Sequence, residues 1–251
     1  MRSFGCSDSL SKDECAEQTP LTAFLGLLFV EARLTIPRDN RFKIAEPINR
    51  EQVEGEHALM TEILDEKLRE WTQGKNALEA RINIFNKIRD IPYAIITEIN
   101  DYERYTDILT IGKGSCSPKH LLLCELYQRL GMSVLFAVYP FRWDEVEIDY
   151  PPKLMKLAQA LPTSHHLACM VDINGELVLV DATLDPALKE MGLPVNEEWD
   201  GISNTQLAII PCGEVQIHHP SEAISMTAQR DEESLAFYGE LNRWLDAFRG
   251  I

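Results

Sequence analysis

Residues 164–183 read SHHLACMVDINGELVLVDAT, and this stretch predicts a β-hairpin. Asn174-Gly175 favours a tight two-residue turn, because both of its central positions need a left-handed backbone. Apolar and β-branched residues flank the turn on both sides, as expected for paired strands. We therefore expect strands over 166–173 and 176–183, joined at this turn.

The expected register brings an imidazole close to a carboxylate. Counting back from the turn places Ala168 opposite Asp181 and His166 opposite Thr183. Side chains alternate between the faces of a strand, so these four share one face and His165 points to the other. Diagonal neighbours on one face lie about 7–8 Å apart at the backbone, within side-chain reach. His166 and Asp181 are therefore predicted to interact.

The rival carboxylate on the first strand is Asp172. It lies six residues along the strand from His166, too far for contact. A register slip of one residue would instead favour His165.

A cysteine fifty positions before His166 stands at a helix-start signal. Residues 112–118 read GKGSCSP; Ser117 is the predicted N-cap and Pro118 fits the first helical position. Cys116 is then expected immediately before the helix, where unpaired N–H groups and the helix dipole favour a thiolate. The two glycines of this stretch are expected to adopt unusual backbone angles.

A thiol, an imidazole and a carboxylate can act as nucleophile, general base and orienting group. Simpler interpretations stay open: Cys116 as an inert buried thiol, and His166 as a strand histidine with an ordinary structural role. A weaker one is a metal site formed by His165, His166 and Cys169, although this spacing matches no standard site.

Composition limits the classes of partner. The chain has 251 residues and a formal charge of −16, which disfavours nucleic-acid backbones and anionic membranes as partners. The longest apolar run, 21–30, is too short to span a bilayer and makes a poor signal peptide. Six scattered cysteines without C-x-x-C pairs favour free thiols in a reducing cytoplasm, with Cys124 and Cys169 as small core residues.

Apolar periodicity predicts helices and strands along most of the chain. The expected helices are 21–33, 49–73, 77–88, 118–130, 153–160 and 232–248. Besides the hairpin, the expected strands are 133–139, 206–210 and 215–218.

The segments around the three site residues, taken in order and spacing, resemble the transglutaminase-like superfamily, the circularly permuted relatives of papain-type thiol enzymes. The resemblance covers roughly residues 77–185 and includes a glycine-cysteine step, an apolar helix, a histidine that starts a strand and an aspartate that closes the next: residues 81–93, 107–116, 116–131, 166–171 and 180–183. It implies that Cys116 is the nucleophile, His166 the base and Asp181 the orienting residue.

The sequence also departs from the family pattern. Pro118 stands where the family often has an acidic residue, and Lys119-His120 replace small apolar residues. Ala168 and Met170 replace an aromatic residue and a glutamate, and Asp-Ala-Thr replaces Asp-Pro-Thr at 181–183. The triad is intact, whereas protein cross-linking is less favoured. His120 is expected to be an exposed helix residue.

The remaining parts of an active site are less sharply indicated. Tyr93, Thr110 and Lys113 are candidates for the second oxyanion donor. Trp143 and Tyr150 are candidates for lining a substrate cleft.

The resemblance implies an α+β fold with a papain-like/transglutaminase-like core, in which a central helix packs on an antiparallel sheet with added N- and C-terminal helices. We expect a helical extension packed on the core over 1–76, the catalytic core over 77–220 and a C-terminal helix over 221–251. The expected activity is acyl transfer or hydrolysis of a peptide, protein or small amide, without metal or organic cofactor. Hydrolysis is favoured, because nothing specifies an amine acceptor. The alternative is a non-catalytic protein- or peptide-binding module that keeps the fold.

Overall fold

The computed structural model describes residues 50–220, 222 and 231–251, with side chains from residue 58 onward. These residues belong to one compact unit, residues 47–251. The predicted helix over 21–33 lies outside the described residues, as do Cys6 and Cys15.

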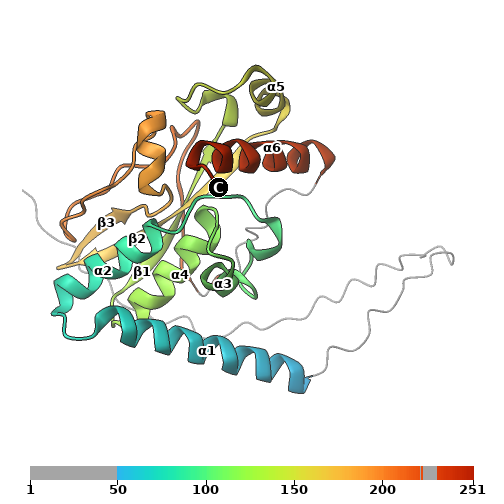
Figure 1. The fold of residues 1–251 in the computed structure, drawn as a ribbon. Coiled ribbons are helices and arrows are strands. Elements are labelled where there is room, and N and C mark those ends of the chain that lie inside the picture. The colour runs from blue at the N-terminus through green and yellow to red at the C-terminus, as the bar shows by residue number, and fades with distance from the viewer. Residues whose placement is uncertain (1–49, 221, 223–230) are drawn as a thin grey trace, which may run out of the picture. The chain divides into compact units, whose positions relative to one another are not determined.

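The described elements form an α+β fold (Figure 1). The helices are α1 (Arg50–Thr72), α2 (Ala77–Arg89), α3 (Ile108–Ile111), α4 (Cys116–Arg129), α5 (Pro152–Ala160) and α6 (Glu232–Arg249). The strands are β1 (Val134–Phe141), β2 (Ser164–Ile173), β3 (Glu176–Val180) and β4 (Gln216–His218). Short 3-10 turns lie at Thr97–Ile99, Tyr105–Asp107, Trp143–Glu145 and Pro186–Met191.

Local sequence signals explain several boundaries. Asn76 and Glu79 form a reciprocal capping box at the start of α2. Gly74, with φ of +72°, separates α1 from α2. Asn174 and Gly175 both have positive φ, as the predicted hairpin turn requires.

The four strands form one antiparallel sheet in the order β3-β2-β1-β4. The hairpin register is the predicted one, with Ile173 opposite Glu176 and Cys169 opposite Val180. Pairing stops there, so the expected strand over 176–183 is three residues too long at its end. The predicted strand over 206–210 is wrong: this segment has no strand, and it supplies backbone contacts to the site instead.

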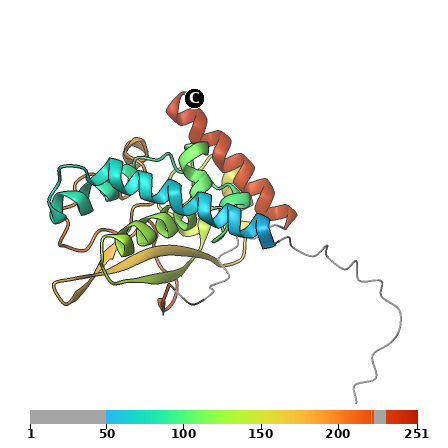
Figure 2. The same cartoon turned by 90° about the horizontal axis from the view of Figure 1, so that it is seen from below.

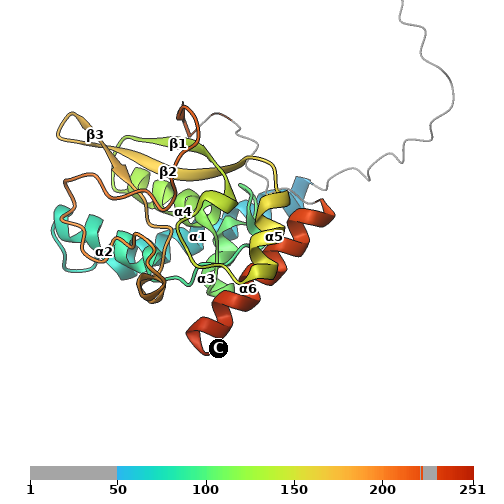
Figure 3. The ribbon, with the colours of Figure 1, turned by 90° about the horizontal axis from the view of Figure 1, so that it is seen from above.

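The helices and the sheet form layers. Helix α4 packs against β1 and β2, and α2 and α1 pack against α4. Figures 2 and 3 show this order from below and from above, with the sheet, then α4, then α1 and α2. The apolar core between these layers has Leu122, Leu126, Phe136, Cys169 and Val180 at its centre.

A second apolar cluster lies away from this core. Helices α5 and α6 pack side by side (Figures 1 and 3). With the segments before α4 and after β3 they bury Tyr93, Leu184, Leu188, Phe237 and Leu241. The site residues lie between the two clusters, because α4 begins and β3 ends there.

None of the helices in the described part of the chain is long and apolar enough to cross a membrane.

Cys124 of α4 and Cys169 of β2 form a disulfide, so the expectation of free thiols is wrong for this pair. The packing of α4 on β2 brings their Cα atoms to 6.5 Å, a distance suited to a disulfide. The 45-residue separation in sequence gives no sign of this contact.

Candidate active site

Cys116 is the first residue of α4. The N-cap is Ser115, with an extended backbone, so the helix begins two residues earlier than predicted and Ser117 is not its cap. Ser117 and Pro118 lie in the first turn, where no backbone N–H has a partner within the helix and proline is tolerated. The Ser115 hydroxyl donates to Asn100 Oδ1 at 2.8 Å, which fixes the cap against the preceding segment. Cys116 therefore stands at the positive end of the helix.

The approach to Cys116 depends on close backbone contact. Gly114 N–H donates to Pro92 O at 3.0 Å, and Ala94 N–H donates to Gly114 O at 3.2 Å. Gly112 has the predicted positive φ of +71°, whereas Gly114 does not. Gly114 is needed for space, because a Cβ atom there would lie 2.4 Å from Ile108 Cδ1.

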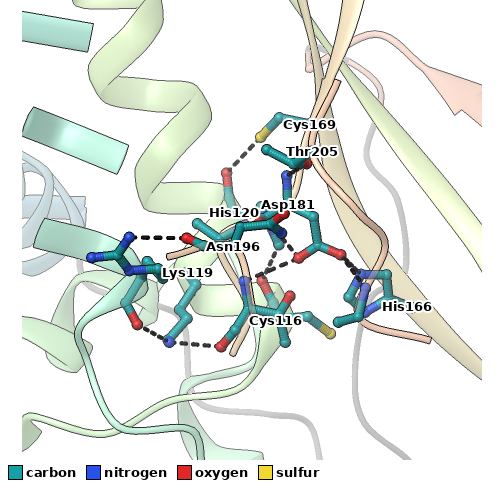
Figure 4. A network of polar contacts seen from close by, with 12 residues as sticks. Cys116, Lys119, His120, His166, Cys169, Asp181, Asn196 and Thr205 are labelled. Carbon is teal, nitrogen blue, oxygen red and sulfur yellow. Dashed lines mark hydrogen bonds and ion pairs between the residues drawn. The ribbon is translucent and has the colours of Figure 1, made fainter. Parts of the chain in front are cut away.

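The structure brings the three predicted site residues together (Figure 4). His166 Nε2 lies 2.8 Å from Asp181 Oδ2, and both side chains are buried. Cys116 and His166 line the same cavity, and His166 is close enough to lower the pKa of the Cys116 thiol. Since Nε2 is engaged by the carboxylate, Nδ1 is the ring atom left for the sulfur. His165, the neighbour excluded by the strand argument, is exposed.

Asp181 reaches His166 from outside the strand ladder. Beyond Val180 the chain leaves β2, and Asp181 N–H donates to Thr205 Oγ1 at 2.8 Å. The carboxylate accepts Thr183 N–H at 3.0 Å on Oδ1 and Ala208 N–H at 2.8 Å on Oδ2. Two backbone donors and one imidazole therefore hold Asp181 in a fixed orientation.

Each of the three groups shifts the pKa of its neighbour toward the charged form. Burial would raise the pKa of the Cys116 thiol, but the hydrogen bond and charge of His166 outweigh it and lower that pKa. Burial would lower the pKa of His166, but Asp181 and the thiolate raise it above its ordinary value. Burial would raise the pKa of Asp181, but the charge and hydrogen bond of His166 outweigh it and lower that pKa. The arrangement thus favours a thiolate–imidazolium pair beside an ionised carboxylate.

His120 was expected on the surface and is instead fully buried. Its Nε2 accepts Ala182 N–H at 2.9 Å, so the proton is on Nδ1, which lies 2.9 Å from Cys116 O. Burial lowers the pKa of His120 to about 4, which keeps the ring neutral. A neutral imidazole therefore ties the first turn of α4 to the chain beside Asp181.

Lys119 is the second buried polar residue that sequence reasoning missed. Its Nζ donates to Thr183 O at 2.7 Å and to Arg89 O at 3.1 Å. Burial lowers the pKa of Lys119 to about 7. Spacing was an available signal, since residues three and four after Cys116 lie on its side of the helix.

A buried ion pair anchors α6 next to the site. Arg249 donates to Asp185 Oδ2 at 2.6 Å and to Tyr93 O at 3.1 Å. Asp185 Oδ2 also accepts Tyr93 N–H at 2.8 Å. The segments before α4 and after β3 are thereby joined to the last described helix.

A cavity of about 380 Å³ opens at Cys116 and His166. Trp143 and Tyr150, predicted as cleft residues, line it together with Tyr93. Thr110 is exposed, and Lys113 donates to both carboxylate oxygens of Asp246 at 2.8 Å. Neither residue lines the cavity, so Tyr93 is the one oxyanion candidate of the three placed there.

The metal interpretation loses a ligand, because the sulfur of Cys169 is joined to Cys124. In the part of the chain that the structure describes, no group of three or more His, Cys, Asp or Glu side chains is placed to hold a metal ion.

No family model and no curated protein matches the sequence. Among solved structures, one described as a "Putative Cysteine Protease" from Cytophaga hutchinsonii is similar at a TM-score of 0.34 and 13% identity. The alignment covers 68% of this chain, which spans about half, 55%, of that protein. A likeness at this level assigns no activity, so the site is judged by its own geometry.

Proposed function

We propose that this chain is a transglutaminase-like thiol enzyme that cleaves an amide or peptide bond through Cys116, His166 and Asp181. The observation that carries the proposal is the buried hydrogen bond between His166 and Asp181, with the Cys116 thiol and the His166 imidazole lining one cavity. A structural cysteine or histidine has no need of this order or of access to a cavity.

Acylation begins with the thiolate. The Cys116 sulfur attacks the substrate carbonyl carbon, and the thiol proton resides on His166 Nδ1. Asp181 holds the ring through Nε2 and stabilises its positive charge. His166 then returns the proton to the departing amine as the C–N bond breaks, and the acyl group remains on the sulfur as a thioester.

The carbonyl oxygen becomes negative in the tetrahedral intermediate and needs donors. The backbone N–H groups at the start of α4 are one source, and we assign the second to the phenol of Tyr93. Burial raises the pKa of Tyr93 well above its ordinary value, so the phenol keeps its proton. Water then attacks the thioester, His166 takes a proton from it, and the acid and free thiol are released.

Selective alkylation tests the nucleophile. Iodoacetamide at about pH 6 should label Cys116 quickly, because an ordinary thiol with a pKa of about 8.5 is almost entirely protonated there. The exposed Cys212 is an internal reference in the same molecule. Peptide mapping with time gives the two rate constants. We expect His166→Ala to slow labelling of Cys116 about 100-fold and to leave that of Cys212 unchanged.

The binding-module alternative gives a different result. It predicts that Cys116 is labelled no faster than Cys212, with no effect of His166→Ala. That outcome would contradict the proposal that Cys116 is an activated nucleophile.

Tyr93→Phe separates the oxyanion donor from the nucleophile. Acylation by p-nitrophenyl acetate forms an oxyanion, whereas alkylation by iodoacetamide does not. We expect the variant to lose about 100-fold in acylation rate and to keep its alkylation rate. Equal losses in both reactions would mean that Tyr93 only supports the local structure.

A further inference from the structure

The cavity at Cys116 is lined without any ordinary acidic or basic side chain. None of its lining residues is Asp, Glu, Lys or Arg. Its buried lining combines polar residues such as Asn100, Ser115, Ser117 and Thr183 with a larger apolar part that includes Phe141, Leu184, Leu188, Leu241 and Leu245. In a chain of formal charge −16 this absence of Asp, Glu, Lys and Arg is a local property of the site.

Several charged side chains on the segments around the cavity have partners of their own. Lys119 donates to two backbone carbonyls, and Lys113 pairs with Asp246. Arg249 and Asp185 pair with each other. The thiolate of Cys116 and the imidazolium of His166 already pair with each other. A substrate carboxylate or ammonium group would therefore find no further counter-ion in this cavity and would lose its hydration, which is strongly unfavourable.

Polar and apolar residues line different parts of the cavity. Ser164, His165, Gln216 and His218 line it from the sheet and are exposed or half-buried. Helix α6 contributes Leu241 and Leu245, which are almost fully buried. The cavity therefore has an exposed polar part at β2 and β4 and a buried apolar part at α6.

The phenols add donors without adding charge. Burial raises the pKa of Tyr150 and Tyr238, as it does that of Tyr93, so all three remain neutral. All three line the cavity.

We propose that this cavity binds the acyl part of the substrate, and that this acyl part is uncharged and apolar, an aliphatic chain or an aromatic side chain. The inference rests on the proposed function, since it assigns the substrate class of the same site. The acyl part stays on the sulfur through both chemical steps while the leaving group departs, so it is the part that an enclosed apolar cavity can hold throughout. A volume of about 380 Å³ is within the range of small-molecule sites.

A series of esters with one leaving group tests this on the native protein. p-Nitrophenyl acetate, butyrate and hexanoate differ only in acyl length, and the mono-p-nitrophenyl ester of adipic acid is the hexanoate analogue with a terminal carboxylate. In each case the sulfur bonds to the carbonyl carbon and p-nitrophenolate leaves. We expect the acylation rate constant of Cys116 to rise up to about fourfold per added methylene. The adipate ester should react no faster than the acetate.

A cavity-filling variant and a matched control test whether the α6 wall causes the preference for the longer acyl group. Leu241→Trp puts a large apolar side chain into the α6 wall and should remove the preference for hexanoate over acetate. Leu235→Trp makes the same change on the outward side of α6, where Leu235 is 46% exposed, and should leave the preference intact. The far-ultraviolet circular dichroism of both variants reports whether they fold, and the ester series on the native protein stands without them.

The outcomes separate the two proposals. Equal rates across the series, or a faster adipate ester, overturn the apolar acyl site and leave the thiol chemistry intact. If neither the esters nor iodoacetamide react at Cys116, the proposed function fails. Calorimetry on Cys116→Ala then tests separately whether the cavity binds an apolar ligand. Binding of hexanamide but not adipamic acid then supports an apolar site, and binding of neither overturns it.

Discussion

His120 carries no charge in the folded protein, and this affects stability at acid pH. Its pKa is about 4 when folded, against about 6.5 in an unfolded chain. Between these values the unfolded state binds a proton that the folded state does not, so stability falls as the pH falls through this window. The folded pKa of His166 is raised, so its contribution to stability is present at low pH and is lost as the pH rises above this window.

We therefore expect urea unfolding to show a loss of about 3 kcal/mol between pH 6.5 and pH 4. Most of this loss should be absent in His120→Gln, which has no titrating ring. The variant will be less stable at pH 7, because the contacts to Cys116 O and Ala182 N–H are disturbed. An equal pH dependence in both proteins would show that His120 is not the group responsible.

Residue types and spacing predicted Cys116, His166 and Asp181 as the candidate site, and the structure places them in contact. Their catalytic role stays a prediction. Lys119 and His120 were not predicted as buried, because a polar side chain reads as exposed on a helix. Their burial follows from the chain after β3, which crosses the first turn of α4, and no local pattern encodes that crossing.

A buried ion pair between Arg249 and Asp185 contributes to the attachment of α6 near the site. Arg249→Met leaves Asp185 in a buried position without its cation, which typically destabilises a protein by about 3–5 kcal/mol. Arg243→Met removes an exposed arginine from the same helix and should change stability by less than about 0.5 kcal/mol. Urea unfolding of the two variants at pH 7 makes the comparison. Similar small losses would mean that this ion pair contributes little to the attachment of α6.

The disulfide between α4 and β2 gives an independent test of how these elements pack. Cys124 and Cys169 should resist iodoacetamide in the denatured, unreduced chain and should be labelled after reduction. Closing a loop of 45 residues, the bond should stabilise the fold by up to about 4 kcal/mol. Urea unfolding with and without reductant measures this. Labelling of both thiols before reduction would show that they are merely neighbours.

Element prediction was most successful where a local signal and a long pattern agreed. The Asn174-Gly175 turn set the hairpin register, and the apolar periodicity located α2, α4 and α6. The wrong strand over 206–210 is an apolar run of strand-like composition. Its Ala208 N–H bonds to Asp181 rather than to another strand, a choice made by tertiary packing.

The charge of the whole molecule predicts a salt effect. A formal charge of −16 favours expansion of the chain through self-repulsion, and salt screens this repulsion. We expect the Tm to rise by a few degrees, about 2–4 °C, between about 10 mM and 150 mM NaCl, as for roughly 1 kcal/mol in a protein of this size. Sucrose of equal osmolality controls for non-ionic effects. A Tm that falls with salt would mean that specific ion pairs outweigh the net charge.

The α+β class was implied by the family resemblance and is confirmed by the described elements, whereas the cavity could not be predicted beyond Trp143 and Tyr150. Its walls come from segments more than a hundred residues apart, such as Tyr93 and Leu241. No pattern in the sequence states which apolar residues fill the core and which surround an empty space. That distinction depends on the volumes left when α5 and α6 pack beside the site.

The position of α6 in the chain has a consequence for synthesis. Translation delivers Cys116, His166 and Asp181 to the folding chain before the residues of α6 emerge. A nascent protein can therefore bring its reactive sulfur and imidazole together while the cavity still lacks its Leu241 and Leu245 wall. If the proposed acyl site is correct, its α6 wall is added after the thiol and the imidazole have met, so a ribosome-bound intermediate would react with acyl donors less selectively than the folded protein.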